Sequence, residues 1–109
     1  MFHDGIPQIT VEGLKGKFDR KEKFTLLDVR ELEEYEVANL GGLHIPLGEL
    51  PARFEEVSKD AEIVVHCHHG GRSQRAAVFL RSKGFKNVKN LSGGIEAWSV
   101  AIDSQVARY

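Results

Sequence analysis

Glu62-Ile63-Val64-Val65-His66, followed at once by Cys67-His68-His69-Gly70-Gly71-Arg72, is the most informative segment of the chain for its fold. Its apolar run has the length and character of a strand that is covered on both faces, as in a parallel sheet. The glycines then allow a tight turn, and apolar side chains recur at helical spacing from Arg72 to Lys83. The stretch predicts a strand, a turn and a helix, with the only cysteine at the carboxyl end of the strand.

The alternation of strand and helix patterns continues on both sides of this stretch. Strand patterns occupy residues 8–10, 24–29, 43–45 and 88–91. Helical patterns occupy residues 11–17, 30–37 and 49–56 and the segment after Gly93-Gly94. We therefore predict one α/β domain over residues 1–109, a three-layer α/β/α arrangement with a central parallel sheet of about five strands. Ligands of such folds bind at the carboxyl ends of the strands, where Cys67 lies.

Composition and charge exclude several classes of function. The chain has 109 residues, of which 41% are hydrophobic and 28% charged, enough for a domain with a real core. A net charge of -1 excludes strong nonspecific attraction to nucleic acid or to an anionic membrane, and the longest apolar run, Ala76 to Leu80, is too short to span a bilayer. Residues 1–7 lack the pattern of a signal peptide and one cysteine cannot form an internal disulfide, so we expect a cytoplasmic protein.

The two signs of charge are segregated along the chain. Residues 28–36 contain five acids and one base, whereas residues 66–89 contain six bases and no acid. One interpretation is a basic helix face that balances an acidic one in solvent, where such pairs contribute little to stability. The other is a local positive field for an anionic substrate or an acidic partner.

The surroundings of Cys67 predict a reactive thiol. A solitary cysteine can simply be a small buried hydrophobe, but this one follows the apolar run and is flanked by histidines, glycines and an arginine. Successive N–H groups in a tight loop converge on one point, the next helix adds positive charge at its N-terminus, and Arg72 adds a full charge. All three favour the thiolate, so we expect a lowered pKa and an ionised, exposed nucleophile.

At these residues the sequence resembles the rhodanese family of sulfurtransferases, over nearly the whole chain. The matching segments are Leu26–Glu31 with Glu34-Tyr35, His44–Leu47, Ile63–Cys67 with Gly70 and Arg72-Ser73, and Leu91–Trp98. The resemblance implies a rhodanese-like fold and a thiosulfate sulfurtransferase without cofactor or metal. Cys67 would accept a sulfane sulfur as a persulfide and pass it to cyanide, a thiol or a sulfur-carrier protein. The resemblance also assigns the binding of the small anionic donor to the loop of His68, His69, Gly70 and Gly71, and the binding of its oxygen atoms to Arg72.

Residues 38–51 are similar to one subgroup of the family, the rhodanese domains fused behind the E1-like adenylyltransferases of molybdopterin and related pathways. The tails of that subgroup tend to contain Ile-Asp-Pro and to end in Tyr. Ile102-Asp103 and Tyr109 match this pattern, whereas Ser104 and Ala107 stand where prolines are expected. The similarity implies an E1-like adenylyltransferase or a ubiquitin-like sulfur-carrier protein as the partner, and a chain that is either a stand-alone relative or an excised piece.

Two other functions compete with sulfur transfer. A cysteine-dependent phosphatase or arsenate reductase has a similar His-Cys motif, but dual-specificity phosphatases resemble one another in having five residues between Cys and Arg, where this chain has four. The shorter loop suits a single sulfur atom, and no well-placed aspartate can be nominated as the leaving-group acid. The second alternative is a non-catalytic rhodanese-like binding module, and the retained Cys67 argues against it.

Three polar residues are expected to support the site: Asp28 and Arg30, which follow the neighbouring strand at the same edge of the sheet, and Ser73. For Arg30 two roles stay open, substrate binding and a structural ion pair with an acid such as Glu34, four residues on.

The run of His66, Cys67, His68 and His69 could be taken for a metal cluster, because imidazole and thiolate both bind zinc. Four consecutive residues cannot all face one ion, and neither His3 nor His44 is predictably close, so we predict no metal site. His68 and His69 are then rim residues that tune donor access, and His66 is a hydrogen-bonded polar group at the end of its strand.

Overall fold

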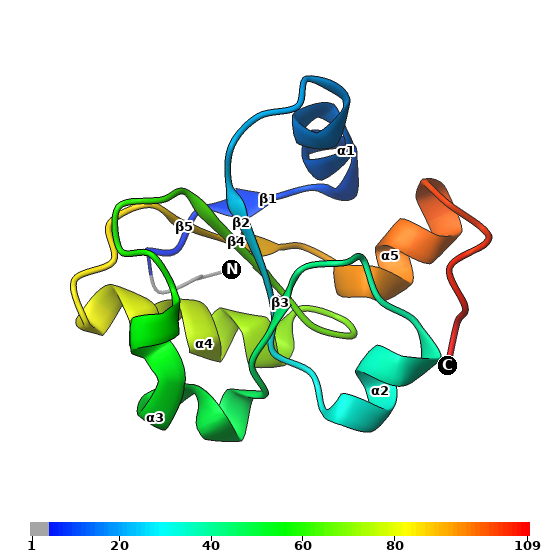
Figure 1. Ribbon diagram of the computed structural model, residues 1–109. Helices are drawn as coiled ribbons and strands as arrows, with labels where there is room; N and C mark the ends of the chain where they lie inside the picture. The colour runs from blue at the N-terminus through cyan, green and yellow to red at the C-terminus, as the bar shows by residue number, and fades with distance from the viewer. Residues whose placement is uncertain (1–4) are drawn as a thin grey trace.

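The computed structural model describes residues 5–109 and contains a wholly parallel sheet (Figure 1). Its five strands lie in the order β1-β5-β4-β2-β3. The strands are β1 (Gln8–Ile9), β2 (Thr25–Asp28), β3 (Leu43–His44), β4 (Ile63–His66) and β5 (Val88–Leu91). The predicted α/β class and the predicted parallel sheet are confirmed.

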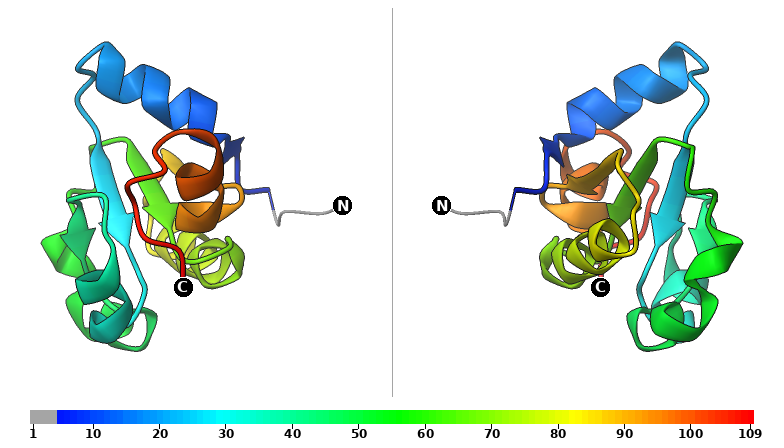
Figure 2. Two further views of the ribbon diagram at one scale, coloured as in Figure 1. Left: turned by 90° about the vertical axis from the view of Figure 1, so that its right-hand side faces the viewer. Right: turned by 90° about the vertical axis from the view of Figure 1, so that its left-hand side faces the viewer.

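Helices cover both faces of this sheet. They are α1 (Val11–Asp19), α2 (Leu32–Val37), α3 (Leu50–Arg53), α4 (Gly71–Ser82) and α5 (Gly94–Ala101). α1 and α5 lie on one face, and α3 and α4 lie on the other (Figure 1 and Figure 2). Each face has its own buried cluster, with Leu14 and Trp98 in the first and Leu50 and Leu80 in the second. The three-layer arrangement is confirmed.

The segment 49–56, predicted as one helix, is divided in the structure. α3 lies between two short 3-10 turns, η1 (Leu47–Glu49) and η2 (Phe54–Glu56). Arg53 has φ -125° and ψ 3°, outside the helical range, so the regular α-helix ends there. Leu50 and Phe54 nevertheless both pack into the core, as their spacing indicated.

α2 begins two residues later than the pattern over residues 30–37 predicted. Glu31 is extended, with φ -72° and ψ 159°, and forms a capping box with Glu34, whose side chain accepts a hydrogen bond from the Glu31 N–H at 3.1 Å. The helix therefore begins at Leu32, directly after this cap, and the cap fixes the carboxylate of Glu34 on the first turn.

The strand register brings polar residues together at the carboxyl edge of the sheet. Asp28, at the end of β2, lies beside His44 of β3 and His66 of β4. Cys67 follows β4 directly, so the predicted site residues belong to one edge of the sheet.

Among residues 5–109, no helix is long and apolar enough to cross a membrane. The expectation that the chain lacks a signal peptide concerns residues 1–7, of which residues 1–4 lie outside the described part.

Candidate active site

The loop that follows β4 turns sharply at Gly70. The φ of this residue is 117°, in the left-handed region that glycine adopts at little cost. The loop is also tied to α5, because the carbonyl oxygens of Cys67 and His68 accept hydrogen bonds from the N–H groups of Ile95 and Glu96, at 3.0 and 3.1 Å. The loop is therefore held from both faces of the sheet, by α4 and by α5.

The sulfur of Cys67 accepts hydrogen bonds from the start of α4. Its donors are the Gly70 N–H at 3.1 Å, the Ser73 N–H at 3.4 Å and the Ser73 hydroxyl at 3.3 Å. Burial raises the pKa of the Cys67 thiol, but the hydrogen bonds from Ser73, Gly70 and His69 outweigh burial and hold the pKa below its ordinary value. The predicted direction of the pKa shift is confirmed.

Cys67 is buried, with 1% of its surface exposed, so the expectation of an exposed thiol is wrong. It lines a pocket of about 320 Å³ together with His68, His69, Gly71, Arg72 and Arg75. The strand buries the cysteine because its side chain also packs against the core cluster under α4. The structure thus brings the predicted loop residues and Arg72 around one opening, while Gly70 contributes its N–H to the sulfur.

Arg72 is bound to a carboxylate. Its two terminal nitrogens donate to the two oxygens of Glu34, at 2.6 and 2.9 Å. The hydrogen bonds from Arg72 are the main reason why the pKa of Glu34 falls to about 2, and burial opposes them. That Arg72 binds the sulfur donor stays a prediction. In the structure its guanidinium is already paired with Glu34, so a sulfur donor would have to bind beside this ion pair.

The C-terminal residue packs over this ion pair. The Tyr109 hydroxyl donates to Glu34 Oε2 at 2.9 Å, and its ring stacks on His68 with centroids 3.9 Å apart and planes at 9°. His68 in turn lies against His69, with ring centroids 4.0 Å apart. The two histidines are therefore part of a stacked rim that includes the chain's last residue.

Arg30 forms a buried ion pair with Asp28, not with Glu34. Its Nε and Nη2 donate to the Asp28 carboxylate at 3.0 and 2.7 Å, and Nη2 also donates to Ala38 O at 2.6 Å. Glu34 offers Arg30 only its backbone oxygen, at 3.2 Å, because its carboxylate faces Arg72. Arg30 has 0% of its surface exposed and does not line the pocket. Arg30 and Asp28 thus form a buried pair at the carboxyl edge of the sheet, and their role in supporting the site stays a prediction.

His66 is buried behind the pocket, but the expectation that it is hydrogen-bonded is wrong. Neither ring nitrogen has a hydrogen-bond partner among the described residues, and Nε2 lies 3.8 Å from Asp28 Oδ2. Burial lowers the pKa of His66 to about 4, so its imidazole is neutral at pH 7. The strand places this side chain in the interior, where the nearest carboxylate is already taken by Arg30.

Two residues of the site were missed by the sequence reasoning. The sequence pattern indicates Glu34 as part of the family resemblance and as a partner for Arg30, not for Arg72, and it does not point to Asn90. Asn90 lies on β5, is buried, and accepts a hydrogen bond from the Ser73 hydroxyl at 2.5 Å. A polar amide within a strand that is otherwise mostly buried and apolar was the signal that could have found it.

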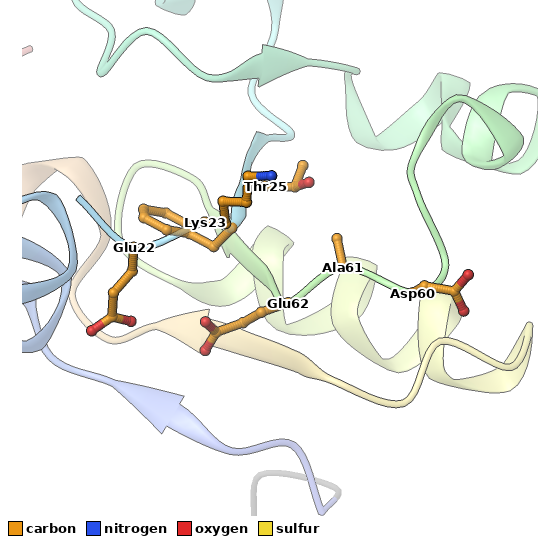
Figure 3. A pocket seen from close by; sticks show the side chains of 7 residues that line it. Glu22, Lys23, Thr25, Asp60, Ala61 and Glu62 are labelled. Carbon is orange, nitrogen blue, oxygen red and sulfur yellow. The ribbon is translucent and has the colours of Figure 1, made fainter. Parts of the chain in front are cut away.

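A larger pocket, of about 660 Å³, lies at the opposite edge of the sheet (Figure 3). Its side chains come from the segments before β2 and β4, and they include Glu22, Lys23, Asp60 and Glu62. The described residues that line it include no cysteine or histidine. Over residues 5–109, no group of three or more His, Cys, Asp or Glu side chains is arranged to hold a metal ion, and His3 lies outside this range.

A cysteine at the carboxyl end of a parallel strand, with its sulfur held by the first turn of a helix, defines a class of α/β proteins that can use a thiolate nucleophile. The chain belongs to the rhodanese-like domain family, whose sequence model matches residues 10–101. The resemblance drawn from the motifs is thereby confirmed, and with it membership of a sulfurtransferase family.

Curated relatives include both larger proteins and proteins of similar length. The chain is 45% identical over 95 residues to "Putative sulfur carrier protein YrkF" of Bacillus subtilis, a match that covers 86% of this chain and 51% of that protein. It is 36% identical over 110 residues to the adenylyltransferase and sulfurtransferase MOCS3-2 of Zea mays, covering 94% of this chain and 23% of the relative. It is 35% identical over 80 residues to the thiosulfate sulfurtransferase GlpE of Coxiella burnetii, covering 72% of this chain and 75% of the relative. The chain thus spans about half the length of YrkF and a smaller part of the maize protein.

Solved structures share the fold. The reduced CoADR-RHD of Bacillus anthracis superposes with a TM-score of 0.84 and 32% identity, over 96% of this chain and 19% of that one. A rhodanese-related protein from Thermoplasma volcanium superposes with a TM-score of 0.77 and 31% identity, over 84% of this chain and 89% of that one.

Proposed function

We propose that this chain takes sulfane sulfur from thiosulfate and passes it to a thiophilic acceptor. The Cys67 thiolate attacks the outer sulfur of thiosulfate, the S–S bond of the donor breaks, and its electron pair leaves with sulfite. Cys67 is left as a persulfide anion. Cyanide or a thiolate then attacks the outer sulfur, and the electron pair of the S–S bond returns to Cys67. Atoms and charge balance in both steps without a cofactor.

The observation that carries the proposal is the set of donors on the Cys67 sulfur. The N–H groups of Gly70 and Ser73 and the Ser73 hydroxyl all face it, next to an open pocket. Such donors favour an anionic sulfur, and a lowered pKa increases the fraction of thiolate at neutral pH. A cysteine that served only to fill the core would need neither the donors nor the opening.

The charge around the pocket supports an anionic donor. Two arginines, Arg72 and Arg75, line it with Cys67. Glu34 neutralises Arg72, whereas no ion pair joins Arg75 to any other described residue. Thiosulfate as the donor draws further support from the relative GlpE, whose name describes a thiosulfate sulfurtransferase.

The acceptor is proposed by analogy with two other relatives. The names of YrkF and MOCS3-2 associate their chains with a sulfur carrier and with an adenylyltransferase. We therefore propose a ubiquitin-like sulfur-carrier protein or an E1-like adenylyltransferase as the physiological partner, with the chain acting as one rhodanese-like domain in the cytoplasm. A non-catalytic binding module is the competing function, and persulfide formation distinguishes it.

The test is intact-mass analysis of the full chain after incubation with thiosulfate. The wild-type protein should gain the mass of one sulfur atom, dithiothreitol should remove it, and cyanide should release it as thiocyanate. Cys67→Ala should show neither the gain nor the release. Sulfur transfer that persists in Cys67→Ala would refute the nucleophile, and a wild-type chain that never gains sulfur from thiosulfate, polysulfide or a low-molecular-weight persulfide would favour the binding module.

A further inference from the structure

The hydroxyl of Ser73 lies between two acceptors. Its oxygen is 3.3 Å from the sulfur of Cys67 and 2.5 Å from Oδ1 of Asn90, and all three residues are buried. A serine hydroxyl has one proton and donates one full hydrogen bond at a time. The two contacts therefore compete for the same proton.

The amide of Asn90 is held in a single orientation. Its Nδ2 donates to Gly70 O at 3.2 Å and to Gln8 Oε1 at 2.9 Å, and Gln8 Nε2 donates to Ile6 O at 3.1 Å. Backbone carbonyl oxygens can only accept, so they fix which end of each amide is nitrogen. Asn90 Oδ1, a pure acceptor, must then face Ser73.

We propose that Asn90 is a positioning residue that competes with the Cys67 sulfur for the hydroxyl proton of Ser73. While Cys67 is a thiol, Ser73 donates to Asn90, and its oxygen can accept from the S–H group. When the thiol loses its proton to solvent, the hydroxyl rotates toward the anionic sulfur and gives up the bond to Asn90. No proton leaves Ser73 in either state.

Because Ser73 must give up its bond to Asn90 to reach the sulfur, it stabilises the thiolate less than it would in a site without Asn90. The competition has a further consequence that rests on the proposed function: once a persulfide forms, the negative charge moves to the outer sulfur, and the hydroxyl returns to Asn90. The inner sulfur is then held by backbone N–H groups alone. Ser73 thus stabilises the attacking and leaving thiolate more than it stabilises the persulfide, which favours delivery of the sulfur.

Substitution of Asn90 leaves in place the charged and titratable groups around the sulfur. These are Arg72 and Arg75 on α4, Glu34 on α2, His68 and His69 in the loop, Glu96 on α5, Tyr109, and Asp28, Arg30 and His66 at or just after the ends of β2 and β4. A change in the titration of Cys67 in an Asn90 variant therefore comes through Ser73 or through the bond from Asn90 to Gly70 O, and a double variant without the Ser73 hydroxyl separates the two.

The experiment is the pH dependence of alkylation of Cys67 by iodoacetamide, an uncharged reagent, in the folded full chain. Asn90→Leu should move the titration midpoint to lower pH and speed alkylation about threefold on its acidic side, because Ser73 is released to the sulfur. Ser73→Ala should move the midpoint to higher pH. The double variant should match Ser73→Ala, because Asn90 acts through Ser73.

Ser92→Ala is the matched control, since the Ser92 hydroxyl also contacts Gln8 Oε1, at 3.3 Å, but not Ser73; its midpoint should equal that of the wild type. Asn90→Ala replaces Asn90→Leu if the larger side chain prevents folding. A midpoint that rises in the Asn90 variant, or an Asn90 effect that persists in the absence of the Ser73 hydroxyl, would overturn the proposal. Alkylation needs no sulfur donor, so this result is independent of whether thiosulfate is a substrate.

Discussion

Arg72 and Glu34 form a bidentate ion pair that joins the first turn of α4 to the first turn of α2. The pair connects residues 38 positions apart, at 2.6 and 2.9 Å, on the rim of the cysteine pocket. Tyr109 donates to the same carboxylate. The acidic and basic segments of the chain therefore meet at the pocket, and the acidic segment compensates part of the positive charge that the basic one brings.

The ion pair should make stability depend on pH in a defined window. The pKa of Glu34 is about 2 in the folded chain and 4.5 ordinarily, so its stabilising effect is complete above the ordinary value and is lost as the pH falls toward 2. Glu34→Gln should lower the free energy of unfolding near neutral pH by about 2 kcal/mol, allowing for partial exposure. Urea unfolding of both proteins at several pH values measures this difference in the free energy of unfolding.

The difference between Glu34→Gln and the wild type should shrink steadily below the ordinary pKa. Glu33→Gln, which removes an exposed neighbouring charge that has no ion pair with any of residues 5–109, should change little at any pH. A difference for Glu34→Gln that stays constant down to pH 2 would mean that the substitution acts through packing or the capping box alone.

Arg75 should contribute to the binding of an anionic donor. It lines the pocket without a carboxylate partner among the described residues, so its positive charge is available. Arg75→Gln should raise the KM for thiosulfate on the order of tenfold and leave kcat nearly unchanged, because the charge acts on the free donor. Arg75→Lys should recover most of the loss.

Lys86→Gln removes an equal charge from the exposed segment before β5, away from the pocket, and serves as the control. An uncharged trisulfide donor adds a second comparison, since its use should not depend on Arg75. If Arg75→Gln lost the same activity with thiosulfate and with the uncharged trisulfide, Arg75 would act by shaping the pocket and not through its charge.

Much of the fold could be predicted because the sequence repeats one physical pattern. The apolar runs that become β2 and β4 are covered on both faces, and among the described residues every residue with positive φ except Lys21 is a glycine. The prediction was least accurate where propensity is weak. Residues 49–56 have helical spacing, but Arg53 leaves the helical range and divides them.

The site was only partly predictable, because its charge pairing depends on tertiary contacts. Cys67 and its loop are contiguous in sequence, so their chemistry could be inferred. The acid that pairs with Arg30 could not be inferred, because Asp28 and Glu34 are both close to Arg30 in sequence. Only the fold turns the Glu34 carboxylate toward Arg72. Asn90 reaches Ser73 only after β5 has paired beside β4.

The pair of Arg30 and Asp28 should be essential for stability. Both side chains are buried, so an unpaired guanidinium would remain in the interior if the carboxylate lost its charge. Asp28→Asn should lower the free energy of unfolding by about 3 to 5 kcal/mol. Asp60→Asn, at an exposed position, should change it by less than about 0.5 kcal/mol. Urea unfolding compares the two variants, and a loss of stability in Asp28→Asn as small as that in Asp60→Asn would refute the importance of the buried pair.

Gly94 should be irreplaceable because α5 begins directly against the cysteine loop. Its φ is 59°, and a Cβ atom there would lie 2.5 Å from the backbone oxygens of both Cys67 and His68. These oxygens accept hydrogen bonds from the N–H groups of Ile95 and Glu96, so neither can move without breaking a hydrogen bond. Gly94→Ala should cost at least about 2 kcal/mol of stability and slow both alkylation and persulfide formation at Cys67.

Gly48→Ala is the appropriate comparison, because an added Cβ at that position meets no atom within 4 Å. It should unfold and react like the wild type. If Gly94→Ala loses stability but keeps the reactivity of Cys67, the contact with α5 supports only the fold. If both fall together, the position of the nucleophile depends on a backbone contact from the face of the sheet opposite α4, and the second glycine of the Gly93-Gly94 pair is a requirement of the site as well as of the helix start.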